Sequence, residues 1–145
     1  MAATNGYSEQ FILELYRKEH DVENDSLVCC LMKPAFVFDP ATDATWADVS
    51  ADEIAAGNGY LSKTEVLANV AASIVAGVIK IDCDDPAWTA GGGAIASAGG
   101  MIVINDSHGS DTVVCSIDFD ATYDPATGTT FQVSCTNGLL KGTPQ

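Results

Sequence analysis

The stretch Val78-Ile-Lys-Ile-Asp-Cys-Asp-Asp-Pro-Ala-Trp88 decides the fold class of this chain. Positions 79, 81 and 83 are apolar, whereas Lys80, Asp82 and Asp84 alternate with them. Such a period of two is typical of a half-buried strand. Asp85-Pro86 then ends the strand, because proline cannot donate to a sheet ladder. The stretch therefore predicts a strand with an apolar face and an acidic outer face, followed by a corner and a large apolar side chain, Trp88.

Other segments add strands to this one. Segments 112–120 and 130–136 alternate in the same way and flank turn residues at 124–128, which predicts a β-hairpin. Segments 27–32 and 95–104 are apolar on both faces, as central strands are, and a glycine pair predicts a bulge in the second. Segment 70–81 is rich in β-branched residues and favours extended structure from about Ser73.

One helix and one long loop interrupt the strand pattern. Segment 8–20 predicts the helix, with an apolar stripe at helical spacing and a basic end; the residues are Phe11, Ile12, Leu15 and Tyr16, then Arg17, Lys18 and His20. Segment 39–60 is a long acidic loop, in which the capping-box spacing of Ser50 and Glu53 predicts a helical turn over 51–56. Trp46 and Tyr60 would fix this loop to the domain or face a partner.

These elements predict a single domain over residues 1–145. Its fold class is mainly β: an antiparallel, jelly-roll-like β-sandwich with one short N-terminal helix (8–20) and a long acidic loop (39–60). A chain of this length buries enough surface to need no disulfide or metal for stability.

Composition excludes several classes of partner. Twenty acidic residues against six basic ones give a formal net charge of −14, which repels nucleic acid phosphates and anionic membranes. No run approaches the roughly 18 apolar residues of a membrane span, and the N-terminus lacks the features of a signal peptide. The five cysteines form no CxxC pair, and we expect reduced core thiols in a protein made in a reducing compartment.

Candidate chemistry is sparse. Asp82 and Asp84 share one strand face, as do Asp118 and Asp120; if the two strands were neighbours, four carboxylates would converge on a possible calcium site. The two histidines, His20 and His108, lie far apart in the sequence and beside no nucleophile motif. We therefore assign no catalytic, cofactor or metal residue and expect a protein that is not an enzyme and needs no cofactor.

Several short motifs together resemble a family of small virion proteins of tailed bacteriophages. They are Asp48-Val-Ser-Ala-Asp-Glu-Ile54, Gly57-Asn-Gly-Tyr60, Ile81-Asp-Cys-Asp-Asp-Pro-Ala-Trp88, Ser116-Ile-Asp-Phe119 and Asn137-Gly-Leu-Leu140. The glycine-rich strand entry expected after Tyr60 is replaced by Leu61-Ser-Lys-Thr-Glu65.

The resemblance implies a non-enzymatic structural protein, made in the host cytoplasm and placed on the capsid exterior as a head decoration (cement) protein. The implied partner is the major capsid protein, and a dimer or trimer would fit the local symmetry axes of a head. Segments 8–20 and 39–60 are the expected contact surfaces. A tail, neck or fibre component is the first alternative, and a calcium- or carbohydrate-binding module is the second.

Overall fold

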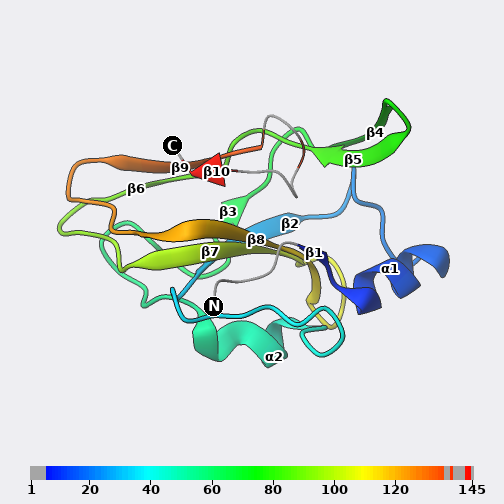
Figure 1. Cartoon of the computed structure of the whole chain (residues 1–145), viewed down its shortest axis with the longest axis horizontal. Helices are drawn as coiled ribbons and strands as arrows, with labels where there is room; N and C mark the ends of the chain where they lie inside the picture. Colours follow the sequence, from blue (N-terminus) through cyan, green and yellow to red (C-terminus); the bar gives the residue numbers. More distant parts are fainter. Residues whose placement is uncertain (1–5, 136–137, 139–142, 145) are drawn as a thin grey trace.

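The computed structural model describes residues 6–135, 138 and 143–144 and shows a mainly β chain with antiparallel sheets (Figure 1). Its strands are β1 (Gly6–Tyr7), β2 (Leu27–Met32), β3 (Glu65–Val66), β4 (Ala71–Val75), β5 (Val78–Asp82), β6 (Ala87–Thr89), β7 (Ala98–Asn105), β8 (Thr112–Tyr123), β9 (Thr130–Ser134) and β10 (Thr143–Pro144). The helical elements are α1 (Glu9–Tyr16), α2 (Trp46–Val49) and the 3-10 turn η1 (Ser50–Asp52).

The strands form three sheets. The largest has the order β1-β8-β7-β2-β3, a second has the order β10-β9-β6, and β4 and β5 form a separate hairpin. The predicted central strands are confirmed, since β7 pairs with β8 on one side and β2 on the other, and β2 in turn pairs with β3. The predicted bulge is confirmed by a register shift between Ala98 and Gly100.

The main buried cluster contains side chains of both the five-stranded and the three-stranded sheets. Trp88 of β6 is 3% exposed, and its ring lies 6.2 Å from that of Phe131 on β9. Phe131 in turn meets Phe119 of β8 edge-on at 5.7 Å. Trp88, the large apolar side chain that follows the predicted corner, is therefore part of the buried core.

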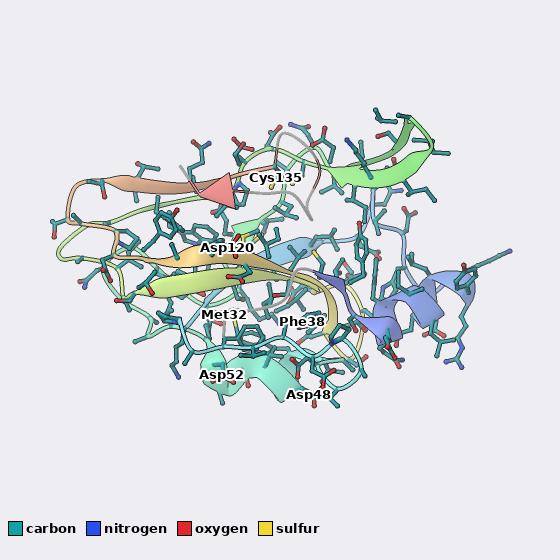
Figure 2. The ribbon with its side chains drawn as sticks, in the orientation of Figure 1. Met32, Phe38, Asp48, Asp52, Asp120 and Cys135 are labelled. Carbon is teal, nitrogen blue, oxygen red and sulfur yellow. The ribbon has the colours of Figure 1, made fainter. Side chains whose placement is uncertain are left out.

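A second core covers the opposite face of the five-stranded sheet. Phe36, Phe38 and Val49, from the long segment after β2, bury Val28, Cys30, Met32 and neighbouring apolar side chains of the sheet. Met32 and Phe38 lie between the sheet and α2, whereas the exposed Asp48 and Asp52 lie on the outer side (Figure 2). Because both faces of the sheet are covered, every side chain of β2 is buried.

The predicted helical turn at 51–56 is wrong in position. The helix begins earlier, at Trp46, because Thr45 and Asp48 form the capping box: the Asp48 carboxylate accepts the Thr45 N–H at 2.8 Å. Glu53 takes a different role and accepts a hydrogen bond from the Tyr60 hydroxyl at 2.6 Å. Asn58-Gly59 form a turn, since Gly57 and Tyr60 on either side exchange two backbone hydrogen bonds.

The predicted hairpin between 112–120 and 130–136 is also wrong. β8 pairs with β1 and β7, whereas β9 pairs with β6 and β10 in the other sheet. Residues 124–129 cross between the sheets, so Phe119 and Phe131 face each other across the core instead of lying side by side. The predicted alternation is observed in β9 from Thr130 to Val133, whereas residues 112–117 of β8 are buried on both faces. Alternation in any case identifies a buried face and not a partner strand. Residue 136 lies outside the described residues.

Two further elements are shorter than the sequence predicted. Segment 70–81 is not one strand but a hairpin, because Ala76 and Gly77 both adopt positive φ and make a two-residue turn. The helix predicted over 8–20 spans Glu9–Tyr16, since Lys18 adopts the left-handed conformation at φ 61°. Its basic end therefore lies beyond the last helical turn. No helix of the described residues is long and apolar enough to cross a membrane.

Candidate functional site

An apolar groove is lined by residues of β1, α1 and β5. α1 and the β4–β5 hairpin lie at the same end of the molecule (Figure 1). The volume of the groove is about 370 Å³, and its lining is Tyr7, Phe11, Ile12, Leu15, Tyr16, Ile79 and Ile81. β1 and α1 supply the first five of these residues, and β5 supplies the last two. The groove is thus built from elements adjacent in space but separated by more than sixty positions of the sequence.

The rim of this groove exposes an unusual amount of apolar side chain. Ile74 and Ile79 oppose each other in the β4–β5 register, and each is 73% exposed. Tyr16 on α1 is 86% exposed, while Ile12 and Leu13 are 37% and 44% exposed. Ile12, Tyr16 and Ile79 line the groove, while Leu13 follows Ile12 on α1 and Ile74 pairs with Ile79. We call these five residues the apolar rim. Of the apolar stripe predicted for the helix, α1 buries Phe11 and leaves Ile12 and Tyr16 exposed.

A second feature is a polar cluster that brings the chain's two histidines together. His20 follows α1 and His108 lies in the β7–β8 turn, and their ring centroids are 4.7 Å apart. His20 Nε2 lies 2.7 Å from Glu14 Oε2, and the side chains of His20 and Glu14 are 0% and 6% exposed. Ligand atoms of Glu14, His20 and His108 all lie within 4.8 Å of one another.

The hydrogen bonds of this cluster indicate which nitrogen of His20 carries the proton. Asn105 Nδ2 lies 2.9 Å from His20 Nδ1 and also donates to Asp25 at 2.6 Å. An amide nitrogen is only a donor, so His20 Nδ1 accepts and its Nε2–H donates to Glu14. Thr112 Oγ1 donates to the same carboxylate oxygen at 2.8 Å and lies 2.9 Å from His108 Nδ1.

The Glu14 carboxylate is held in its ionised form. Burial alone would raise its pKa, but hydrogen bonds from Gln10, Thr112 and His20, together with the charge of His108, outweigh burial and lower the pKa. Three donors fix the buried carboxylate in place, so the cluster also has a structural role. It joins α1 to β8 and to the turn that precedes it.

The acidic residues singled out in the sequence are not brought together. Asp82 lies on β5, which pairs with β4, whereas Asp118 lies on β8, which pairs with β1 and β7. Asp84 accepts a hydrogen bond from Asn69, and Asp120 donates its backbone N–H to the Asp118 carboxylate. Within the described residues, the one group of three potential metal ligands is Glu14, His20 and His108.

The sequence alone does not predict that His20 and His108 contact Glu14, because no spacing of residues along the chain indicates this cluster. His20 and His108 are 88 positions apart, and only the pairing of β8 with β7 and the packing of α1 on β8 bring them together. Glu14 stands three residues after Phe11, on the buried face of α1, which is the one local signal of an inward carboxylate.

The cysteines and the long loop have structural positions. Cys29, Cys30, Cys115 and Cys135 are buried and free, and Cys83 is half-buried and free. Burial raises the pKa of the Cys30 thiol to about 12, so it stays protonated at neutral pH.

Tyr60 is fully buried and accepts a hydrogen bond from the Leu31 N–H, so it fixes the loop to the chain's own sheet and not to a partner.

Comparisons with known proteins add no relative: no protein-family model, no curated protein and no solved structure matches this chain.

Proposed function

We propose that this chain is a non-enzymatic structural protein of a bacteriophage virion, a decoration (cement) protein that binds the major capsid protein on the head exterior. The observation that carries the proposal is the apolar rim with its groove between α1 and the β4–β5 hairpin. Exposed large apolar side chains gathered around a groove are typical of a protein-binding surface.

The charge distribution supports the same role. Arg17 and Lys18 follow the end of α1, next to the apolar rim in the sequence, and are two of only six basic residues in a chain with 20 acidic ones. An acidic surface keeps the bound protein soluble and away from packaged DNA, whose phosphates it repels. Many copies on one head would stabilise the shell through many weak contacts acting together.

We also propose that the domain is a β-sandwich. The buried cluster that contains Leu31 and Ile117 of the five-stranded sheet also contains Trp88 and Val133 of the three-stranded sheet. A rigid core between two sheets suits a protein that must hold its contact surface fixed. Segment 39–60, the second contact surface expected from the sequence, contributes less, because its large side chains Val49, Ile54 and Tyr60 are buried.

Binding to undecorated heads tests the proposal. The unmodified protein should co-sediment with heads and raise the temperature at which they release DNA. The double variant Tyr16→Ser/Ile79→Ser removes the most exposed side chains of the groove and should weaken binding at least tenfold. Leu61→Ser, which removes an apolar side chain that is 59% exposed outside the groove, should bind like the unmodified protein.

Three outcomes would overturn the proposal. Failure of the unmodified protein to bind or protect heads removes the decoration role, and binding to tails alone moves the protein to the tail. Equal loss of binding in Leu61→Ser and the double variant removes the groove as the contact surface. Light scattering during size-exclusion chromatography measures the proposed dimer or trimer.

A further inference from the structure

We propose that Glu14, His20 and His108 form a binding site for one zinc ion. Two imidazoles and one carboxylate are a donor set that zinc takes with bonds of about 2.0–2.2 Å, which place the ligand atoms roughly 3.3 Å apart. The three residues already hold their ligand atoms within 4.8 Å of one another, so small side-chain movements suffice. The inference is independent of any role in a virion.

The donor set selects against the other common cations. Calcium and magnesium take six or more oxygen ligands, whereas this cluster offers one carboxylate and two nitrogen ligands. Imidazole suits zinc and its neighbours in the transition series. The site therefore differs from the calcium site that the strand carboxylates would have formed.

The site has a rigid inner side and an open outer side. Gln10 and Thr112 hold the Glu14 carboxylate at 2.6 and 2.8 Å, and the His20 ring lies 4.9 Å from that of Phe11. On the outer side, the His108 side chain is 20% exposed, and Glu19 Oε2 lies 3.5 Å from its Nε2. Solvent can reach His108, and Glu19 or water can supply a fourth ligand.

Zinc binding must rearrange the hydrogen bonds of the metal-free cluster. When Nε2 of His20 binds the ion, the hydrogen bond from its N–H to Glu14 is lost, and the proton of the neutral ring moves to Nδ1. Asn105 then turns its amide so that Oδ1 accepts a hydrogen bond from the Nδ1–H, and it gives up its hydrogen bonds with Asp25 and with the Ser107 N–H. Asn105 is thus the outer partner that sets the ring's tautomer in both states.

Calorimetric titration of the full chain with zinc chloride, in a phosphine reductant, tests the site. We expect saturable binding of one ion. His108→Gln removes the most accessible nitrogen ligand and should weaken binding at least tenfold, with the fold checked by circular dichroism. The matched control Asp82→Asn/Asp84→Asn removes two exposed carboxylates elsewhere and should bind zinc like the unmodified protein.

Cobalt(II) absorption separates this site from the five free cysteines without any variant. Ligation by imidazole and carboxylate gives only weak d–d bands, whereas ligation by thiolate adds a strong charge-transfer band in the near ultraviolet. We expect d–d bands alone. Absence of binding heat, unchanged affinity in a folded His108→Gln variant, or a thiolate band would each overturn the proposal and leave the cluster as a hydrogen-bonded network.

Discussion

Tyr60 joins three parts of the molecule through one hydroxyl group. The hydroxyl oxygen accepts a hydrogen bond from the Leu31 N–H at 3.0 Å, at a position of β2 that β3 no longer pairs with. The hydroxyl also donates a hydrogen bond to Glu53 at 2.6 Å. Burial, together with Glu53, raises the pKa of Tyr60 far above its ordinary value, so the hydroxyl keeps its proton at every pH at which the protein folds.

Tyr60→Phe should therefore lower the free energy of unfolding by about 1–3 kcal/mol, because a buried N–H of β2 loses its acceptor. Tyr16→Phe removes a hydroxyl from a ring that is 86% exposed and should change stability by less than about 0.5 kcal/mol. Urea denaturation followed by fluorescence measures both. Equal effects of the two substitutions would mean that the Tyr60 hydroxyl bonds water instead.

Trp88 provides the second prediction at this scale. Trp88→Ala should cost about 3–5 kcal/mol, because the ring fills the core against Tyr60 and Phe131. The exposed carboxylates that precede it offer a control, and Asp82→Asn/Asp84→Asn should cost less than about 1 kcal/mol in the same urea titration. A Trp88→Ala loss below 1 kcal/mol would contradict the core position.

At the scale of the elements, the backbone of β7 at Gly99 passes very close to Pro34, in the segment after β2. A Cβ added to Gly99 would lie 2.5 Å from the Cα of Pro34, a backbone atom that cannot move independently. Gly99→Ala should therefore destabilise the protein by about 1–3 kcal/mol, through a shift of the bulge or of Pro34. Gly109→Ala, in the β7–β8 turn, meets no atom within 4 Å and is the matched control. Thermal denaturation measures both variants, and an equal fall of the two melting midpoints would contradict this contact.

The α2 capping box predicts a pH dependence. The backbone N–H and the hydroxyl of Thr45 hold the pKa of Asp48 below its ordinary 3.8. Since the folded pKa is the lower one, the stabilisation is present above pH 3.8 and is lost as the pH falls through the folded value. Carboxyl-carbon NMR should show that Thr45→Ala raises the pKa of Asp48 only part of the way, because the N–H remains. Ser50→Ala should leave it unchanged; an unchanged value in Thr45→Ala would refute the box.

Most strands could be predicted from local pattern, but their partners could not. Residues 27–32 and 112–120 carry their burial pattern in their own side chains, so their strands were predicted correctly. β8 and β9 were assigned to one hairpin because alternation is a property of each strand alone. The β4–β5 turn was missed because Ala76 is an uncommon residue at positive φ. The helix end was misplaced because Lys18 adopts the same rare conformation.

For the whole molecule, long-range pairing decides which side chains can act together. The sequence predicts α1 as a contact surface, and the structure leaves its Tyr16 exposed, but the sequence could not show that β5 completes the groove. The cluster of Glu14, His20 and His108 was equally out of reach, because it depends on the packing of α1 against β8. The carboxylates on β5 and β8 failed to converge for the same reason: their strands belong to different sheets.

The net charge of −14 predicts how the whole molecule responds to salt. Twenty acidic residues repel one another over distances that shrink from about 30 Å to about 8 Å as ionic strength rises from 0.01 to 0.15 M. Salt also weakens attractive pairs: Lys63 lies 2.5 Å from Asp106 and 2.9 Å from Asp111. Each exposed pair contributes at most about 1 kcal/mol, so relief of repulsion should dominate.

The urea midpoint at pH 7 should therefore rise as sodium chloride increases over that range. Lys63→Met removes both ion pairs and adds to the excess of acid, so its midpoint should start lower and rise more steeply. Choline chloride at equal ionic strength should give the same slopes, because screening depends on charge and not on the identity of the cation. A midpoint that falls with salt would show that the Lys63 pairs outweigh the repulsion, and a rise with sodium alone would indicate specific cation binding by the acidic surface.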